Sequence, residues 1–71
     1  MKPESKAIRN LSRNLRQVRL DRRLSQEDLA ELVGLDRTYI SDLERGLRNP
    51  SLKTLARVAA ALDITIGELC D

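Results

Sequence analysis

Aromatic side chains are nearly absent from this 71-residue sequence, which contains one tyrosine and neither phenylalanine nor tryptophan. A hydrophobic core must therefore be built from Leu, Ile, Val and Ala, a composition that suits packed helices better than a sheet. Histidine is also absent, and Cys70 is the single cysteine. These absences exclude an internal disulfide and a zinc site of the usual kind, and we interpret Cys70 as a packing residue.

Long apolar runs are missing as well, and the opening residues Met-Lys-Pro-Glu-Ser-Lys lack the apolar region of a signal peptide. We therefore predict a cytoplasmic protein with no membrane partner. A chain of this length buries a modest core, so residues 1–71 are expected to form one domain. Without histidine or a cleft of paired carboxylates, the sequence predicts no enzyme and indicates no cofactor, metal or small-molecule ligand.

Positive charge is concentrated in the first third of the chain. Residues 1–24 contain eight Lys or Arg and two acids, whereas residues 25–71 contain five Lys or Arg and nine acids. A basic segment either attracts a polyanion or keeps a helix face in water, and on charge alone both interpretations stay open.

Apolar residues recur at helical spacing along the whole chain. A first helix is predicted from the apolar stripe of Ile8, Leu11, Leu15 and Val18. Arg19 falls inside this stripe, and the opposite face carries Arg9, Arg13, Arg16 and Arg23.

Capping residues place four further helices. Ser25-Gln-Glu-Asp is a capping box that opens the second helix, and Gly34 ends it. Asp36 opens a third helix of about Arg37–Arg45, ended by Gly46, whose predicted inward residues are Ile40, Leu43 and Leu47. Ser51 opens a fourth, whose predicted inward residues are Leu52, Leu55, Ala56, Ala59 and Leu62. Thr65-Ile-Gly-Glu opens a last turn through Leu69, so the sequence predicts an all-α, compact five-helix bundle.

Residues 26–45 have the dimensions of a helix-turn-helix, in which the turn is Gly34-Leu35-Asp36. The positions that such a unit buries hold Leu29, Val33, Leu35, Ile40 and Leu43. Ala30 stands where the two helices cross closely, and Gly34 stands where the turn needs a positive φ. This pattern favours a DNA-binding unit over an αα-corner with no nucleic-acid role.

The outer face of the third helix carries hydrogen-bonding side chains. Arg37 can bind guanine O6 and N7, the Thr38 methyl can pack on thymine, and Asp42 can accept from cytosine N4. The base-reading residues are therefore predicted to be Arg37, Thr38, Ser41 and Asp42.

Contacts to the DNA backbone are predicted around this face. Gln26 stands at the N-terminus of the second helix, where free N–H groups favour a phosphate. Tyr39 lies at the border of the reading face, and Arg45, Arg48 and Asn49 follow it. The arginines of the first helix either join these contacts or only solvate their face, and the sequence leaves both open.

Three strings, Ser25-Gln-Glu-Asp-Leu-Ala, Gly34-Leu-Asp-Arg-Thr-Tyr-Ile-Ser-Asp-Leu-Glu-Arg-Gly46 and Asn49-Pro-Ser-Leu52, resemble the Cro/CI (xenobiotic-response-element) family of phage-repressor-like transcription regulators. The resemblance runs from about Leu11 to Leu69. The Arg-Thr-Tyr-Ile-Ser string and the short length are similar to the controller proteins of restriction–modification systems. The resemblance implies a homodimer that activates or represses from a pseudo-palindromic operator in double-stranded DNA. An antitoxin that binds DNA and a partner protein is the alternative.

The resemblance further implies an ion pair between Arg19 and Glu44, because an arginine of the first helix pairs with a glutamate near the end of the recognition helix in this family. The position of Arg19 in the apolar stripe agrees, since a partly buried charge needs a partner. The resemblance also implies a dimer contact at the C-terminal end. Residues 64–71 are predicted to provide it through the apolar cluster of Ile64, Ile66 and Leu69, with a cap on the monomer core as the alternative.

Overall fold

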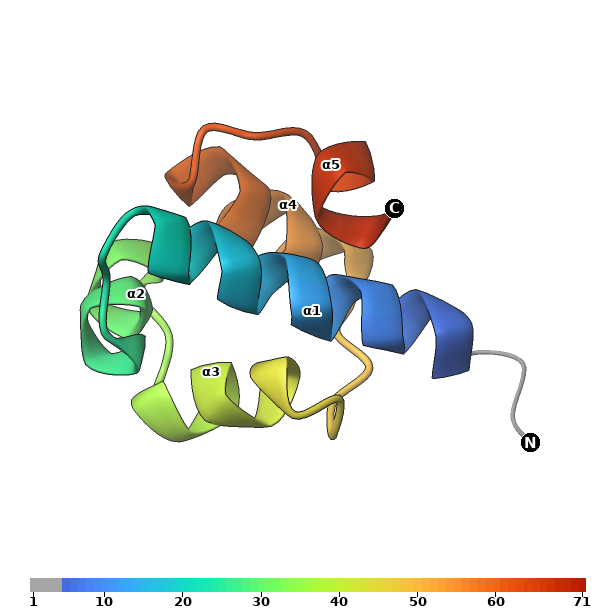
Figure 1. Cartoon of the computed structure of the whole chain (residues 1–71), viewed down its shortest axis with the longest axis horizontal. Helices are drawn as coiled ribbons and strands as arrows, with labels where there is room; N and C mark the ends of the chain where they lie inside the picture. The colour runs from blue at the N-terminus through green and yellow to red at the C-terminus, as the bar shows by residue number, and fades with distance from the viewer. Residues whose placement is uncertain (1–4) are drawn as a thin grey trace.

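The computed structural model describes residues 5–71, with side chains from Lys6 onward. Within this range the chain forms five helices and no strand: α1 (Ser5–Asp21), α2 (Gln26–Val33), α3 (Arg37–Glu44), α4 (Leu52–Ala61) and α5 (Ile66–Cys70). The prediction of an all-α five-helix bundle is confirmed (Figure 1). Of the six opening residues that predict no signal peptide, residues 1–4 lie outside the described range.

Side-chain caps fix where the short helices begin. The hydroxyl of Ser25 accepts from the Asp28 N–H, and the Ser25 N–H donates to the Asp28 carboxylate, so both halves of the capping box are formed. Thr65 and Glu68 form the same box at α5, while Asp36 and Ser51 cap α3 and α4. Each cap satisfies backbone N–H groups that the first helical turn leaves without partners.

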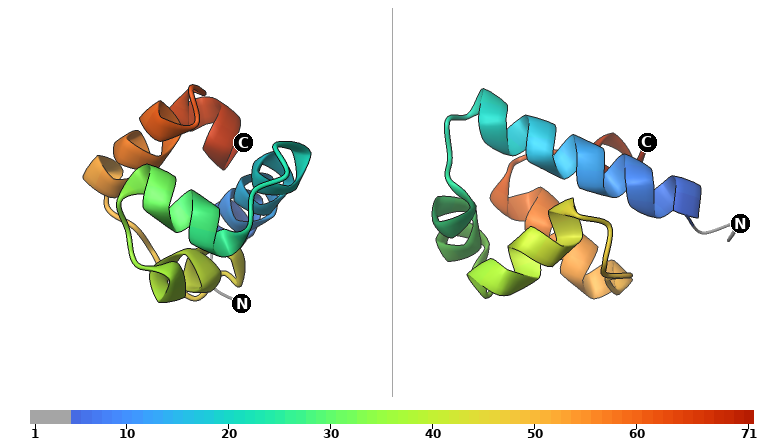
Figure 2. Two further views of the ribbon diagram at one scale, coloured as in Figure 1. Left: turned by 90° about the vertical axis from the view of Figure 1, so that its left-hand side faces the viewer. Right: turned by 60° about the horizontal axis from the view of Figure 1, so that its bottom comes forward.

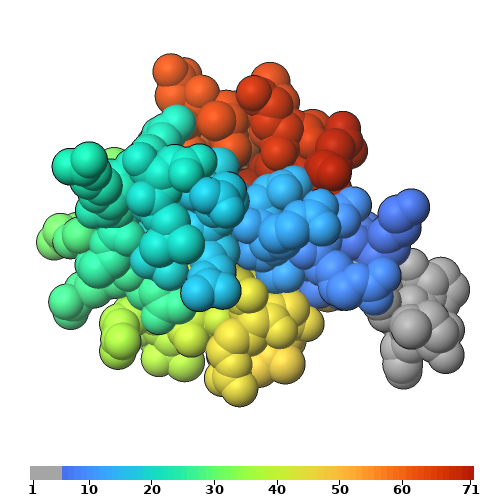
Figure 3. All heavy atoms as spheres, viewed as in Figure 1, coloured from blue at the N-terminus to red at the C-terminus, as the bar shows by residue number. Residues whose placement is uncertain are grey.

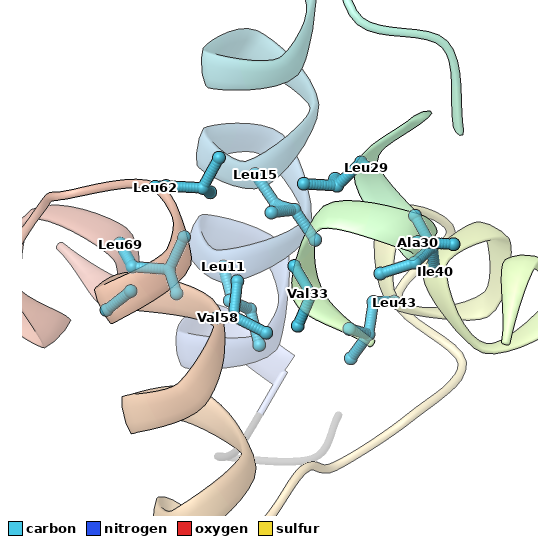
Figure 4. Close-up of a cluster of buried hydrophobic side chains, with 11 residues drawn as sticks. Leu11, Leu15, Leu29, Ala30, Val33, Ile40, Leu43, Val58, Leu62 and Leu69 are labelled. Atoms are coloured by element: carbon cyan, nitrogen blue, oxygen red, sulfur yellow. The ribbon is translucent and has the colours of Figure 1, made fainter. Parts of the chain in front are cut away.

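The five helices enclose one aliphatic core. In Figure 1 the long α1 crosses the front of the molecule and contacts α3 and α5, while α2 packs against α3 and α4. Figure 4 shows the buried side chains converging from all five helices. The buried residues are Leu11, Leu15, Leu29, Ala30, Val33, Ile40, Leu43, Val58, Ala59, Leu62 and Leu69.

Two leucines that were predicted to point inward do not. Leu47 is 59% exposed and Leu52 is 69% exposed. The helical spacing does not reach Leu47, because α3 ends at Glu44 and Gly46 turns the chain at φ 73°.

In α4 the side chains that meet the core begin one turn later than predicted, at the half-buried Leu55. Ala56 is exposed, whereas Val58, which the prediction missed, is buried. Leu52 is the first residue of α4, so it lies ahead of the point where α4 meets the core.

Candidate nucleic-acid interface

The turn between α2 and α3 is built by Gly34-Leu35-Asp36. Gly34 adopts the left-handed conformation at φ 81°, and its N–H donates to the Ala30 carbonyl at 2.8 Å. The Leu35 N–H donates to the same carbonyl at 2.9 Å. Ala30 is buried and Leu35 is half-buried, so both side chains of the turn region pack against the core. These helices and this turn form the predicted helix-turn-helix.

Arg57 of α4 stabilises this turn through two hydrogen bonds. Its Nε donates to the Val33 carbonyl at 2.9 Å, and its Nη2 donates to the Gly34 carbonyl at 3.0 Å. The carbonyls at a helix C-terminus lack partners and carry partial negative charge, so a cation there is favourable. Sequence reasoning missed this role. The carbonyls at a glycine cap favour a cation nearby, but Arg57 lies 23 residues beyond Gly34, so local sequence does not identify it as that cation.

The outer face of α3 is available to a ligand. Arg37 and Thr38 are exposed and Ser41 is half-buried, whereas Ile40 and Leu43 on the opposite side are buried. Seen with the bottom of the molecule forward, α3 lies along the near face with α2 at its N-terminal end (Figure 2, right). In the space-filling view, α3 and the loop after it form the lower edge (Figure 3).

Three of the predicted contact residues, two on α3 and one in the loop after it, lie together. The Nε of Arg48 donates to Asp42 Oδ2 at 3.2 Å, and the Arg48 guanidinium carbon stands 5.3 Å from the centre of the Tyr39 ring. Asp42, predicted to read a base, is therefore bound to a predicted backbone contact. Arg45 and Asn49 are exposed beside this cluster in the chain.

Glu44, at the last position of α3, is the centre of a half-buried polar network. Arg19 donates to both carboxylate oxygens, from Nε at 2.6 Å and from Nη2 at 3.0 Å. Arg19 Nη1 donates to the Leu24 carbonyl at 2.9 Å. Gln26 Nε2 donates to Glu44 Oε1 at 3.1 Å, so the side chain predicted to contact phosphate joins this network. The network ties α1, α2 and α3 together at one point.

The basic face of α1 borders a surface hollow of about 310 Å³. Glu44 reaches one edge of the hollow, and α1 lines the rest with Ser12, Arg13, Arg16, Gln17 and Leu20. Neither Arg13 nor Arg16 has an ion pair within residues 5–71. The hollow therefore presents cations directly beside the end of α3.

The C-terminal cluster departs from its prediction at one residue. Leu69 has no exposed surface, because α5 seats it in the monomer core, and Asn14 Nδ2 of α1 donates to its carbonyl at 3.1 Å. The prediction that Leu69 offers its side chain to a second copy is wrong. Ile64 and Ile66 pack on the core and stay half-buried.

Cys70 is half-buried, and its pKa is raised by burial and, to a lesser extent, by the charge of Asp71. A raised pKa keeps the thiol protonated, in line with a packing role. Within the described residues, no three His, Cys, Asp or Glu side chains are grouped to hold a metal, and no helix combines the length and hydrophobicity needed to cross a membrane.

A family model described as helix-turn-helix matches residues 15–69. The chain is 47% identical over 60 residues to control protein C.MunI of Mycoplasma sp, covering 84% of this chain and 78% of the other. It is 41% identical over 59 residues to an immunity repressor of Bacillus phage phi105, covering 83% of this chain and 41% of that repressor.

Solved structures agree with this similarity. The restriction–modification controller protein C.AhdI of Aeromonas hydrophila superimposes with a TM-score of 0.82 at 47% identity, covering 87% of this chain and 94% of that chain. The biofilm regulator SinR, which Bacillus subtilis carries, was solved in complex with DNA. It superimposes with a TM-score of 0.79 at 35% identity, covering 86% and 98% of the two chains.

Proposed function

This chain belongs to the helix-turn-helix family of DNA-binding transcription regulators, and from that premise we propose that it reads a pseudo-palindromic operator as a homodimer. The observation that carries the proposal is the two-sided α3, which buries Ile40 and Leu43 and turns Arg37 and Thr38 to solvent. A helix of this kind fits the major groove of double-stranded DNA and meets base edges with its N-terminal residues.

Base readout is assigned to Arg37, Thr38 and Ser41. Arg37 is exposed in the first turn of α3 and offers the paired N–H groups that match guanine. The test is to select duplexes from a random pool with the wild-type protein and with Arg37→Ala. We expect Arg37→Ala to lose about 1–3 kcal/mol of operator affinity and the preference for one guanine in each half-site. An unchanged selected sequence would overturn the assignment.

Arg48→Ala is the matched control, since it removes a cation from the same surface outside the base-reading set. It is expected to weaken operator and random DNA by the same factor. Gln26 contributes through its position at the N-terminus of α2, where backbone N–H groups favour a phosphate. Arg45 and Asn49, exposed after α3, extend the backbone contacts.

Dimerisation is proposed because one recognition helix covers only a few base pairs, and this architecture reads half-sites about 34–36 Å apart. The apolar surface for a second copy is assigned to Ile64, just before α5, to Ile66 at its start, and to Leu52 of α4. Helix α4 packs against α5. A second copy is the expected occupant because a two-fold operator needs two recognition helices held at fixed spacing.

Ile66→Glu tests the dimer, with Leu52→Glu as an independent variant on α4. Both are expected to keep their helical circular dichroism, to sediment as monomers, and to bind one half-site without cooperativity. A wild-type protein that is monomeric at high micromolar concentration and binds its operator as one copy would exclude the dimer.

A place in restriction–modification control is the proposed subtype. Its support is the similarity to two controller proteins, each matched over more than two thirds of its length. The test is genomic: a restriction endonuclease or methyltransferase gene should adjoin this gene, with an operator upstream that the purified protein binds. Operators found solely beside unrelated genes would refute the subtype and leave the DNA-binding role intact. The site of action is proposed to be the cytoplasm, where bacterial DNA lies.

A further inference from the structure

Arg48 is held on two sides by residues of α3. Its side chain is half exposed, yet its Nε is bonded to Asp42 Oδ2 and its guanidinium lies over the Tyr39 ring. Tyr39 and Asp42 are three residues apart on one helix, so they are neighbours on the same face. A side chain from the loop after α3 is thereby folded back onto the edge of the reading face.

The contacts leave one end of the guanidinium unused. Asp42 accepts from Nε and the guanidinium carbon lies over the Tyr39 ring, whereas Nη1 and Nη2 have no hydrogen-bond acceptor within residues 5–71. Two parallel N–H groups of this kind match two oxygens of a phosphate. Arginine side chains in solution sample many rotamers, and ordering them on binding costs affinity. Here that ordering is already present without DNA.

Asp42 is poorly placed to read a base on its own. Its side chain is 20% exposed, and one carboxylate oxygen is already an acceptor for Arg48. A carboxylate at a DNA interface also repels phosphates unless a cation neutralises it. The pair with Arg48 supplies that cation, so the charge of Asp42 is neutralised where the DNA would lie.

We propose that Asp42 is a positioning residue: with Tyr39 it fixes the guanidinium of Arg48 so that the Nη pair meets a DNA phosphate, and it reads no base. The inference rests on the proposed function, because it assigns the work of two residues within that interface. It replaces the sequence-based expectation that Asp42 accepts a hydrogen bond from cytosine.

The direction in which DNA affinity changes when Asp42 is removed distinguishes a positioning role from a purely electrostatic one. Removing a negative charge near a polyanion should raise affinity if Asp42 does nothing else. Removing a positioning contact should lower affinity instead, because Arg48 must then be ordered by the DNA. Glu31→Ala is the matched control: it deletes an exposed carboxylate on α2 that forms no ion pair within the described residues.

The experiment measures binding of a labelled operator duplex and a random duplex by fluorescence anisotropy. Asp42→Ala is expected to weaken both by about 2- to 10-fold, the range set by ordering one long side chain. Asp42→Asn keeps the shape and one acceptor, so its loss should be smaller. Arg48→Ala should reduce the magnitude of the slope of log K against log salt by about 0.9 for each phosphate contact that is lost. Asp42→Ala should have no further effect in the Arg48→Ala background.

Three results would overturn the inference. The first is a gain of affinity for both duplexes with Asp42→Ala, and the second is a changed base preference at a cytosine. The third is an undiminished effect of Asp42→Ala when Arg48 is already alanine. Unaltered thermal melting of each variant shows that the readout reports binding. A wild-type protein that selects no sequence would refute the proposed function itself, whereas these three results leave wild-type binding intact.

Discussion

Arg19→Met should strongly destabilise the fold, because it breaks the ion pair with Glu44 from one side. The substitution removes three hydrogen bonds, two to Glu44 and one to the Leu24 carbonyl. Glu44, whose side chain is 3% exposed, would keep Gln26 as its hydrogen-bond partner in the network and have no cation. Breaking a buried pair from one side typically costs about 3–5 kcal/mol, because the remaining charge is uncompensated.

That loss is large for a chain of this size. Scaling the usual stability per residue to 71 residues gives about 4–11 kcal/mol in total. At roughly 4–8 °C per kcal/mol for a small domain, the melting temperature should fall by at least about 12 °C. Thermal and urea unfolding followed by circular dichroism, without DNA, would measure it.

The double variant Arg19→Met/Glu44→Leu is the control. It replaces both charges by apolar side chains, so its stability should recover most of the loss. If the free energy of unfolding of Arg19→Met is within about 1 kcal/mol of the wild-type value, Arg19 has no structural role. Combined with lost DNA binding, that result would make Arg19 a phosphate contact.

Further expectations concern single positions. Gly34→Ala should lower the free energy of unfolding by about 1–2 kcal/mol in urea titrations, because φ is 81° there and the new Cβ would stand 2.6 Å from Arg57 Nη2; an unchanged midpoint would contradict this. Leu69→Ala should cost about 2–5 kcal/mol by the same assay, since the side chain has no exposed surface, and an unchanged free energy of unfolding would contradict core burial. Hydrogen bonds from Ser25 lower the pKa of Asp28 in the folded protein. The Asp28 carboxylate therefore stabilises the fold above its unfolded-state pKa, and this stabilisation is lost as the pH falls through its folded-state pKa. Asp28→Asn should therefore reduce the acid-induced loss of stability below about pH 4, and identical pH profiles would exclude the effect.

Local rules in the sequence predicted the helix starts well. Ser25, Asp36, Ser51 and Thr65 cap the helices that they were expected to cap, because a cap is settled by residues within one turn. The glycine rule also placed the end of α2 at Gly34, but the helical spacing was extended too far at the end of α3. Leu47 continues the spacing of α3 on paper, but the turn at Gly46 breaks the periodicity before it.

The sequence predicted which residues lie on the exposed face of α3, but it did not predict the contacts that these residues make. The exposed face of α3 follows from the spacing of Ile40 and Leu43, which are buried opposite it. The bond between Asp42 and Arg48 depends on how the loop after α3 folds back, which no periodicity describes. Arg57 was missed for the same reason, since its partners at Val33 and Gly34 become neighbours through tertiary packing.

The packing of α5 against α1 has a consequence for biosynthesis. Asn14 and the Leu69 carbonyl that it binds are 55 residues apart, and Leu69 lies wholly inside the core with Leu11 and Leu15 of α1. At about 5–20 residues per second, the ribosome adds the partner of α1 roughly 3–11 s after α1 itself. The leucines of α1 therefore have no partner from α5 until this last helix has been synthesised. Slower synthesis of the second half of the chain would therefore lengthen the time for which α1 lacks this partner.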